Sequence, residues 1–418
     1  MKVLIYSAGL GGHLQVYGRV IGDFLLEAGW SVTVAVSAEK REWASRWPML
    51  RPWAADERVG GVDTRPAAGS ASGELSAEQL IAVQREARAD VTLLIDGDAF
   101  APQFRRIAGG DAPRLRGRIC AIFSRTSEWC PGEDAYTGRR EPLVGPTLRQ
   151  TLGRARRAML GRRDSPRDFF ERVLLRCRTV DALIVKDERI PRRHGAPVCW
   201  MPEIYRVFDA RPEERADEDW LRFAEPVRRW IEQAGPANVL LYFGSAAWYK
   251  GYDLFLRLAQ GDEAIFALHA GAPDPGPVDR RYGGNLEPIR QTLLRQGRLF
   301  ETNAYIASAN LMELLFGGIS RYVSTHRLTL SSATALQALE MGRPVLTPDT
   351  GLLGWRTREF KLGATYAYGD LADLASKWSA FKTGACDPDP RNVRVFMERF
   401  SRERTQRFFL GVLSGESP

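Results

Sequence analysis

The chain has 418 residues, a length that favours two domains over one compact core. Hydrophobic residues make up 44% and charged residues 26%, the composition of an ordinary soluble globular protein. No run of about 18 apolar residues is present, so a membrane-spanning helix is excluded. The opening "MKVLIYSAGLGGH" predicts a first core strand and not a signal peptide.

The first half of the chain alternates predicted strands and helices. Strands are predicted over 2–8, 31–37, 90–96, 118–124 and 181–187, and a helix over 14–28 that stops at Gly29. This alternation indicates a parallel sheet with helices on both faces. Residues 38–80 are expected to form a surface excursion.

Residues 188–236 interrupt the alternation with six prolines and dense charge, and the domain junction is placed there. The second half then predicts strands over 238–244, 264–271, 297–303, 321–325 and 343–349, and helices over 252–260, 307–316, 331–341, 370–382 and 391–412. The expected domains are an N-terminal Rossmann-like domain over 1–200, a linker over 201–236, a C-terminal Rossmann-like domain over 237–390 and a C-terminal helix over 391–418. A return of that helix to the first domain is left open. Ligands of doubly wound sheets bind at the carboxyl ends of the strands, so a cleft between two facing domains is predicted.

The cysteines of the chain are odd in number and widely spaced: Cys120, Cys130, Cys177, Cys199 and Cys386. The pattern argues against a disulfide framework and against a cysteine-rich metal site. It favours a reducing compartment, so a cytoplasmic location is predicted.

The turn after the first strand contains Gly11, Gly12 and His13. Glycines let the backbone approach a ligand closely, and the free N–H groups at the helix start favour an anion or a sugar hydroxyl. His13 is a candidate base or hydrogen-bond donor there. A histidine that only lines the helix entry explains the same residues.

Polar side chains also follow the other strands of the first half. Asp96, Asp98, Ser124, Arg125 and Lys186 are all expected at strand ends. The two carboxylates could orient acceptor hydroxyls, although an Asp-Gly-Asp turn that caps itself is slightly favoured. Asp96-Gly97-Asp98 fits the letters of a D-x-D motif, but it lies in the half of the chain to which the family resemblance described below assigns the acceptor, so no metal is expected.

The stretch "YFGSAAWYKGYDLF" (242–255) carries the clearest candidate for catalysis. A strand ends at Gly244 and Ser245, and Lys250 and Gly251 precede an amphipathic helix. A lysine at a helix start is unfavourable by the helix dipole, which favours a functional role over a surface one. Its ammonium could neutralise a diphosphate leaving group.

A second candidate is the start of the helix predicted over 331–341. Its small residues, Ser331, Ser332, Ala333 and Thr334, would expose N–H groups and hydroxyls toward a phosphate or sugar. A helix capped by its own serines is the common alternative.

Between Pro146 and Arg178 ten arginines stand against three acidic residues, with apolar residues interleaved. The segment predicts helices with a basic face, which is either an ordinary solvated surface or a dock for a polyanion. Peripheral contact with an anionic membrane on its inner, cytoplasmic face is predicted, and nucleic acid is ranked below it because no DNA-reading motif accompanies the charge.

Taken together, two α/β halves, the "GG" turn, "FG-x5-KG-x-D" and the late "A-x-x-x-G-x-P-V" resemble the GT-B glycosyltransferases, and within them the retaining family 4 group. The resemblance covers nearly the whole chain: "VCWMPEIYRVF" (198–208) is similar to the inter-domain segment, and 297–326 to the strand, base-binding loop and helix. The "GGH" turn is also similar to that of the lipid II-forming N-acetylglucosaminyltransferase.

The resemblance implies a metal-independent hexosyl- or related transferase without a cofactor, in which a nucleotide sugar is the co-substrate. The C-terminal domain would bind the donor, with Lys250 on the diphosphate and Asn303 and Tyr305 near the base. The N-terminal domain would bind a glycan, lipid-linked or natural-product acceptor. Retention would rest on positioning and charge stabilisation, without a protein nucleophile.

Three positions depart from the family pattern. The two glutamates of its Glu-x7-Glu signature fall on Thr329 and Gln337, and an arginine after the "FG" strand is replaced by Ser245. Gln337 keeps one acceptor oxygen but loses the charge. Arg327 and Arg343 are the candidates to compensate. These departures keep two alternatives open, a non-catalytic binding or scaffold protein on the same fold and, ranked last, a DNA-modifying glycosyltransferase.

Overall fold

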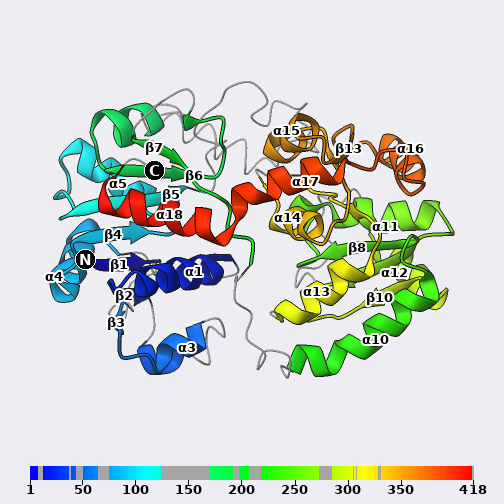
Figure 1. Cartoon of the computed structure of the whole chain (residues 1–418), viewed down its shortest axis with the longest axis horizontal. Helices are drawn as coiled ribbons and strands as arrows, with labels where there is room; N and C mark the ends of the chain where they lie inside the picture. The colour runs from blue at the N-terminus through cyan, green and yellow to red at the C-terminus, as the bar shows by residue number, and fades with distance from the viewer. Residues whose placement is uncertain are drawn as a thin grey trace. The chain divides into compact units, whose positions relative to one another are not determined.

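The protein is described here as a computed structural model, in which the following residues are placed: 1–7, 13–36, 39–43, 50–64, 75–123, 169–191, 197–206, 218–272, 285–304, 306, 308–327 and 331–416. The chain divides into two compact units (Figure 1). Unit 1 comprises Met1–Ala135, Gly145–Val207 and Phe400–Pro418, and unit 2 comprises Tyr136–Val144 and Phe208–Arg399.

Unit 1 is built on a seven-stranded parallel sheet in the order β3-β2-β1-β4-β5-β6-β7. The strands are β1 (Lys2–Tyr6), β2 (Ser31–Val36), β3 (Val59–Asp63), β4 (Val91–Leu94), β5 (Arg118–Phe123), β6 (Ala182–Val185) and β7 (Val198–Trp200). In the central strand β1, Ile5 is in register with Val34 on one side and Leu93 on the other. Runs of buried apolar residues are expected where helices cover both faces of a parallel sheet.

Helices cover the sheet of unit 1. Helices α1 (His13–Glu27) and α18 (Arg402–Ser414) pack together, and Figure 1 shows them side by side. Helices α4 (Ala77–Ala87) and α5 (Ala101–Gly109) and the π-helix η3 (Phe169–Arg176) share a core with the sheet. The short elements η1 (Lys40–Glu42) and α3 (Arg51–Ala54) complete the described part.

Unit 2 contains two three-stranded parallel sheets, β10-β9-β8 and β11-β12-β13. The strands are β8 (Val239–Phe243), β9 (Phe266–Ala270), β10 (Leu299–Glu301), β11 (Tyr322–Val323), β12 (Val345–Pro348) and β13 (Gly363–Tyr366). Strand β11 lies beside β8, so the two sheets are neighbours. The α/β fold with parallel sheets agrees with the prediction from the sequence.

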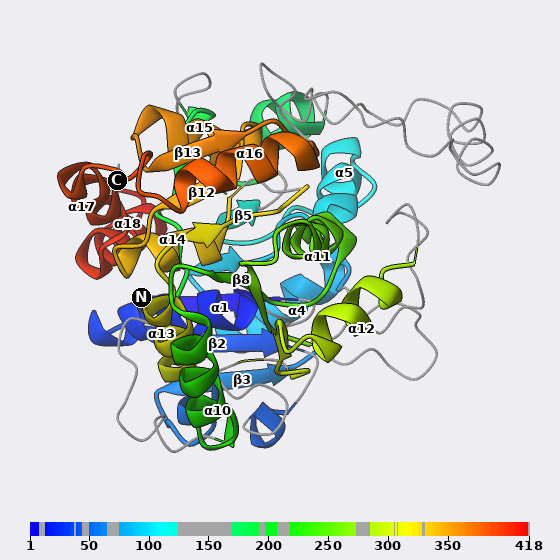
Figure 2. The same cartoon turned by 90° about the vertical axis from the view of Figure 1, so that its right-hand side faces the viewer.

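Two groups of helices surround the strands of unit 2. Helices α11 (Tyr252–Gly261), α12 (Glu287–Arg295) and α16 (Leu371–Phe381) pack together over one core, whereas α10 (Glu218–Ala234) and α13 (Ala309–Gly318) lie against each other, as Figure 2 shows. Helix α14 (Ala333–Glu340) contacts α13 and α17 (Pro390–Met397), and α15 (Gly351–Glu359) contacts β12 and β13.

Several predicted elements are corrected by the structure. The single helix predicted over 391–412 is wrong, because α17 gives way to the 3-10 turn η7 (Glu398–Phe400) and Ser401 caps α18. The linker predicted over 201–236 contains α10, which continues through Pro226. Strand β3 lies within the surface excursion predicted over 38–80.

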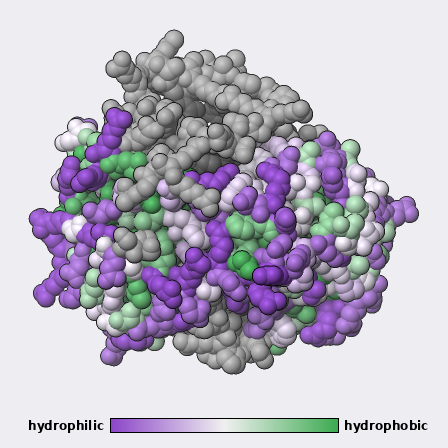
Figure 3. Space-filling model, turned by 45° about the horizontal axis from the view of Figure 1, so that its top comes forward, coloured by the Kyte–Doolittle hydropathy of each residue, from purple (hydrophilic) through white to green (hydrophobic). Residues whose placement is uncertain are grey.

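The described surface carries few large exposed apolar side chains: Met1, Leu221 and Val395. On the face in Figure 3, hydrophilic residues are interspersed with small hydrophobic areas. None of the described helices is long and apolar enough to cross a bilayer.

Candidate functional site

The step between β8 and α11 holds Lys250 against the end of the strand. Gly244 has a φ of +108°, and a Cβ placed on it would collide with the Lys250 Nζ atom. Lys250 lies in the 3-10 turn η5 (Trp248–Lys250), and Gly251, with a φ of +70°, is the N-cap of α11. Burial lowers the pKa of the Lys250 ammonium. The residues therefore bring a partly desolvated cation to the carboxyl end of a parallel strand, where this fold class binds ligands.

Residues after β11 fix this step from the neighbouring strand. The Thr325 hydroxyl donates a 2.8 Å hydrogen bond to the Lys250 carbonyl oxygen. The Arg327 Nη2 atom lies 2.6 Å from the Asp253 carboxylate, and both residues are buried, at 8% and 4% exposure. The Arg327 guanidinium also lies 5.8 Å from the Trp248 ring centroid. Arg327 therefore stabilises the step between β8 and α11 through its ion pair with Asp253. This buried ion pair gives Arg327 a structural role.

His326 follows Thr325 and lies near Lys250. Its Nδ1 atom is 2.8 Å from the Ser324 hydroxyl. Burial and the Lys250 charge lower the pKa of the imidazole to about 3. The sequence analysis missed His326, Thr325 and Asp253 as site residues, although a strand predicted over 321–325 ends directly before His326.

A network of buried polar side chains holds the end of β8 in place. His269 of β9 places Nε2 at 3.0 Å from the Gly244 carbonyl oxygen, and its Nδ1 atom is 3.7 Å from Glu301 of β10. Arg290 of α12 and the Tyr252 hydroxyl also bond to Glu301. The ends of β8, β9 and β10 are thus tied together by polar side chains.

The start of α14 forms a chain of hydroxyl groups. Ser332 is the N-cap, and its Oγ accepts a hydrogen bond from the Ala335 N–H at 3.3 Å. The Thr334 hydroxyl lies 2.7 Å from both the Ser332 Oγ and the Tyr322 hydroxyl. Ser332 therefore fills the capping role that was the alternative to donor binding. Tyr322 belongs to β11, which leads to Thr325 and the Lys250 step.

The other predicted donor residues divide into described and undescribed ones. Ser245 is half-buried, and its carbonyl accepts from the Tyr242 hydroxyl at 3.1 Å. Gln337 is half-buried and donates to the Met312 sulfur at 3.5 Å. Asn303 is exposed after β10 with a φ of +50°. The remaining positions are half-buried Ser331 and Ala333 in the described part, and Tyr305 and Thr329 outside it.

In unit 1, two predicted acceptor residues interact at the ends of β4 and β6: the buried Lys186 and Asp98. Lys186 is 8% exposed, with its Nζ 5.0 Å from the Tyr17 ring centroid. Although burial alone would lower the pKa of Lys186, Tyr17, Glu203 and Asp98 raise it. Asp96 caps its own turn by accepting from the Ala99 N–H.

The glycine turn of unit 1 is described only in part. Gly11, Gly12 and Arg125 lie outside the described residues. His13 is the first residue of α1, and its side chain is not among those described. Tyr17, one turn further along α1, reaches the lysine at the end of β6.

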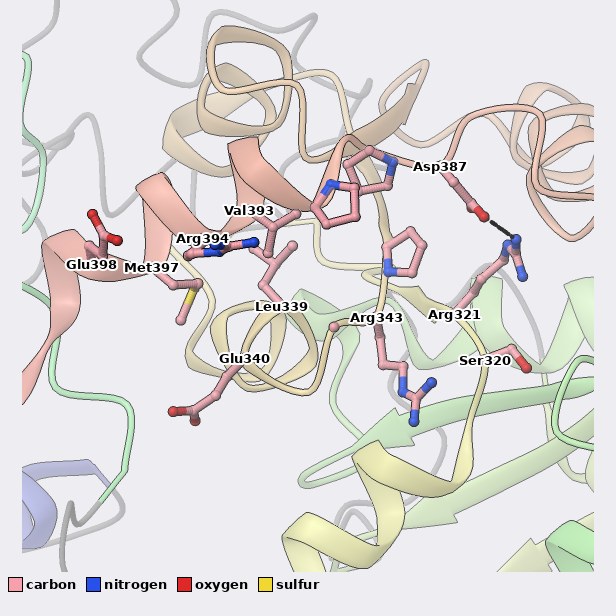
Figure 4. A pocket seen from close by; sticks show the side chains of 14 residues that line it. Ser320, Arg321, Leu339, Glu340, Arg343, Asp387, Val393, Arg394, Met397 and Glu398 are labelled. Carbon is pink, nitrogen blue, oxygen red and sulfur yellow. Dashed lines mark hydrogen bonds and ion pairs between the residues drawn. The ribbon is translucent and has the colours of Figure 1, made fainter.

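A separate pocket of about 930 Å³ lies at the amino ends of β11 and β12 in unit 2 (Figure 4). Arg321 pairs with Asp387 across it at 2.8 Å, as the dashed line in Figure 4 marks. Arg343 donates to the Phe316 and Gly317 carbonyl oxygens at the end of α13. The pocket is therefore on the opposite edge of the strands from Lys250, and Arg343 has a helix-capping role there.

Among the described residues, no cluster of three or more histidine, cysteine or acidic side chains has the arrangement of a metal site.

Replacing Gly251 by alanine is expected to lower the free energy of unfolding by about 2 kcal/mol or more. The residue has a positive φ, and a Cβ there would collide with the Thr325 carbonyl oxygen. The matched control is Gly261→Ala at the end of α11, where a Cβ meets nothing within 4 Å. Chemical denaturation should show a loss for the first variant and a neutral or stabilising change of up to about 1 kcal/mol for the second. Equal losses of unfolding free energy in the two variants would contradict the requirement for glycine at position 251.

Glu301 makes the stability of unit 2 depend on pH. Burial opposes ionisation, but the nearby His269 ring and the hydrogen bonds from Arg290 outweigh it and lower the pKa of Glu301 from 4.5 to about 2. A depressed carboxyl pKa stabilises the fold above the ordinary value, and the stabilisation disappears as pH falls through the folded value. The difference in unfolding free energy between wild type and Glu301→Gln is expected to be about 3 kcal/mol above about pH 5 and to vanish near pH 2. Denaturant titrations of both proteins across this pH range measure the difference, and a difference that stays constant with pH would contradict the role of the Glu301 charge.

Comparison with solved structures identifies the fold class. HepE from Anabaena, solved with UDP, is similar with a TM-score of 0.59 and 13% identity over 99% of this chain and 100% of that one. A glycosyltransferase from Rickettsia africae gives 0.60 and 10% over 99% and 98%, and sucrose-phosphate synthase from Thermosynechococcus elongatus gives 0.58 and 14% over 99% and 97%. The predicted GT-B type of α/β fold is therefore confirmed. No family model and no curated protein matches the sequence.

Proposed function

We propose that the protein is a glycosyltransferase that moves a sugar from a nucleotide sugar to a glycan, lipid-linked or natural-product acceptor, with retention at the anomeric carbon. The observation that carries the proposal is the partly desolvated Lys250 ammonium, held against Gly244 at the carboxyl end of β8. The structures of HepE with UDP and with UDP-glucose support a nucleotide-sugar donor. Unit 2 would bind the donor and unit 1 the acceptor.

Lys250 would stabilise the negative charge that develops on the diphosphate as the bond to the sugar breaks. A preorganised cation in a site that excludes water is worth more than the same cation in solution. The hydrogen bond from Thr325 and the contact of the Arg327 guanidinium with the Trp248 ring fix the step that carries Lys250, so little reorganisation is needed during the reaction. We assign no metal ion to this step.

On the acceptor side, the cluster of Lys186, Asp98 and Glu203 is the best-defined polar group in the described part of unit 1. Carboxylates beside a buried ammonium would accept hydrogen bonds from acceptor hydroxyls and hold them in one orientation. His13 would add a further donor or base at the start of α1.

Thermal unfolding in a panel of nucleotide sugars and nucleoside diphosphates tests the proposal. A donor at about 100 times its dissociation constant is expected to stabilise the protein by about 2.7 kcal/mol. Transfer from the donor that stabilises most, to an acceptor extract, is then followed by mass spectrometry. The proposal fails if no compound of the panel binds.

A non-catalytic binding protein on the same fold is the second candidate. Gln337 and Thr329 in place of two glutamates, and Ser245 in place of an arginine, favour it. It predicts donor binding without turnover, and detection of sugar transfer would exclude it.

The basic segment 146–178 is expected to attach the protein to anionic membranes. Its residues 146–168 lie outside the described part, and the η3 helix follows them. The protein should sediment with vesicles that contain phosphatidylserine at low salt and should be released at high salt, because arginines near a membrane surface contribute about 1 kcal/mol each and salt screens them. Neutral vesicles are the control, and equal sedimentation with both kinds would contradict an electrostatic contact.

A further inference from the structure

The imidazole of His326 has one nitrogen engaged and one available. Its Nδ1 atom is 2.8 Å from the Ser324 hydroxyl, and Ser324 is fully buried. Among the described residues no hydrogen bond to Nε2 is present, and the side chain is half-buried. The segment itself is fixed, because the Tyr366 hydroxyl donates to the Ser324 carbonyl oxygen at 3.0 Å. The ring is therefore oriented while one nitrogen remains able to bind a ligand.

The charges around this ring come from three elements. Lys250 belongs to the η5 turn, and its ammonium disfavours a second positive charge on His326. Arg327 is neutralised by Asp253 of α11 at 2.6 Å. Tyr366 of β13 stays neutral, because burial raises the pKa of its hydroxyl. The Lys250 ammonium is thus the charge that most directly opposes a proton on the ring.

We propose that His326 is a further contact for the diphosphate of the donor, and that it takes up a proton from solvent when the diphosphate binds beside Lys250. This inference rests on the proposed function of the Lys250 step. The bound anion supplies the negative charge that the free site lacks, so imidazolium becomes the favoured state. Nε2–H then donates a charge-assisted hydrogen bond to a phosphate oxygen, and the Ser324 hydroxyl accepts from Nδ1–H.

The consequence is a donor affinity that rises as pH falls. In the free protein the pKa of His326 is about 3, so the ring is neutral near neutral pH. A ligand that binds the protonated form better raises the pKa of the ring in the complex, and it therefore binds more tightly at lower pH. Leaving-group release after transfer would return the proton to solvent.

Histidine-selective NMR tests the inference, since the chain has four histidines. The imidazole nitrogens are followed against pH without and with saturating UDP, or with GDP, ADP or CDP if one of these gives a larger thermal shift. His326→Gln assigns the signal. We expect a neutral ring at all pH values above about 5 in the free protein, and protonation with a midpoint near neutral pH in the complex.

Affinity measurements give a second readout. His326→Gln is expected to weaken UDP binding about tenfold near pH 6 and to remove most of the pH dependence. Arg228→Gln, on an exposed part of α10, is the matched control for loss of one cation. It should leave the affinity for UDP and the pH dependence of that affinity unchanged. Tight UDP binding with a neutral His326 ring and an unaltered affinity in His326→Gln would overturn the inference and leave the proposed function intact. Binding of none of the nucleoside diphosphates would instead overturn the proposed function itself.

Discussion

Lys250→Met is expected to reduce kcat/KM for sugar transfer by about 10²- to 10³-fold, the effect of removing one preorganised charge from a developing anion. Methionine has a similar length, so it can still pack against Gly244. Because burial lowers the pKa of the ammonium, its removal should leave the free energy of unfolding unchanged or slightly higher. Steady-state kinetics and thermal unfolding of the same preparation measure the two effects.

The control for Lys250→Met is Lys382→Met, which removes a lysine from a partly exposed pair with Asp262. That variant should keep its transfer rate and change stability by about 1 kcal/mol or less. Full activity in Lys250→Met would remove the main support for the proposed donor site. A parallel loss of stability and activity would indicate a structural role for the lysine instead.

Asp253→Ala is expected to lower the free energy of unfolding by about 3–5 kcal/mol, because it leaves the Arg327 guanidinium buried without its carboxylate. Arg327 is 8% exposed and lies near the Trp248 ring. The variant should therefore also loosen the turn that carries Lys250 and weaken donor binding. Denaturant titration and nucleotide calorimetry are the measurements.

The double variant Asp253→Ala/Arg327→Met distinguishes the cost of leaving the Arg327 charge unpaired from the cost of losing the Asp253 side chain. Removal of both charges should restore much of the stability that Asp253→Ala loses, with a coupling energy of about 1–3 kcal/mol. The comparison pair is Asp262 with Lys382, whose side chains are 29% and 28% exposed. Asp262→Ala should cost about 1 kcal/mol or less. Equal losses at both aspartates would contradict a buried role for Asp253.

The strands with long apolar runs were predictable because burial on both sheet faces leaves a direct mark on the sequence. The strands β1, β2, β5, β8 and β9 all lie within their predicted ranges. Helix α10 was missed because Pro226 and dense surrounding charge resemble a linker. The break between α17 and α18 was missed because the Ser401 cap interrupts an otherwise continuous amphipathic pattern.

The candidate site was predictable only where its residues are neighbours in the sequence. Gly244 and Lys250 belong to one strand-to-helix step. The glycine at the strand end and the lysine before the helix can both be read from that short stretch of sequence. Thr325 and His326 reach it from about 75 positions away, through the adjacent strand β11. Arg327 was expected as a cationic partner of the lysine, but a buried aspartate in the first turn of α11 binds it. Local patterns do not contain this long-range pairing.

The position of α18 has a consequence for how the protein is made. The Arg118 Nε atom donates to the Val412 carbonyl oxygen, a contact between residues 294 positions apart. Phe409 and Leu413 of α18 are fully buried within unit 1. During synthesis most of unit 1 is therefore made before unit 2, but unit 1 lacks one of its helices until residues 402–414 have left the ribosome. The sheet of unit 1 would remain partly uncovered while unit 2 is synthesised. Because apolar surface is then exposed to solvent, aggregation is most favoured at this stage of synthesis.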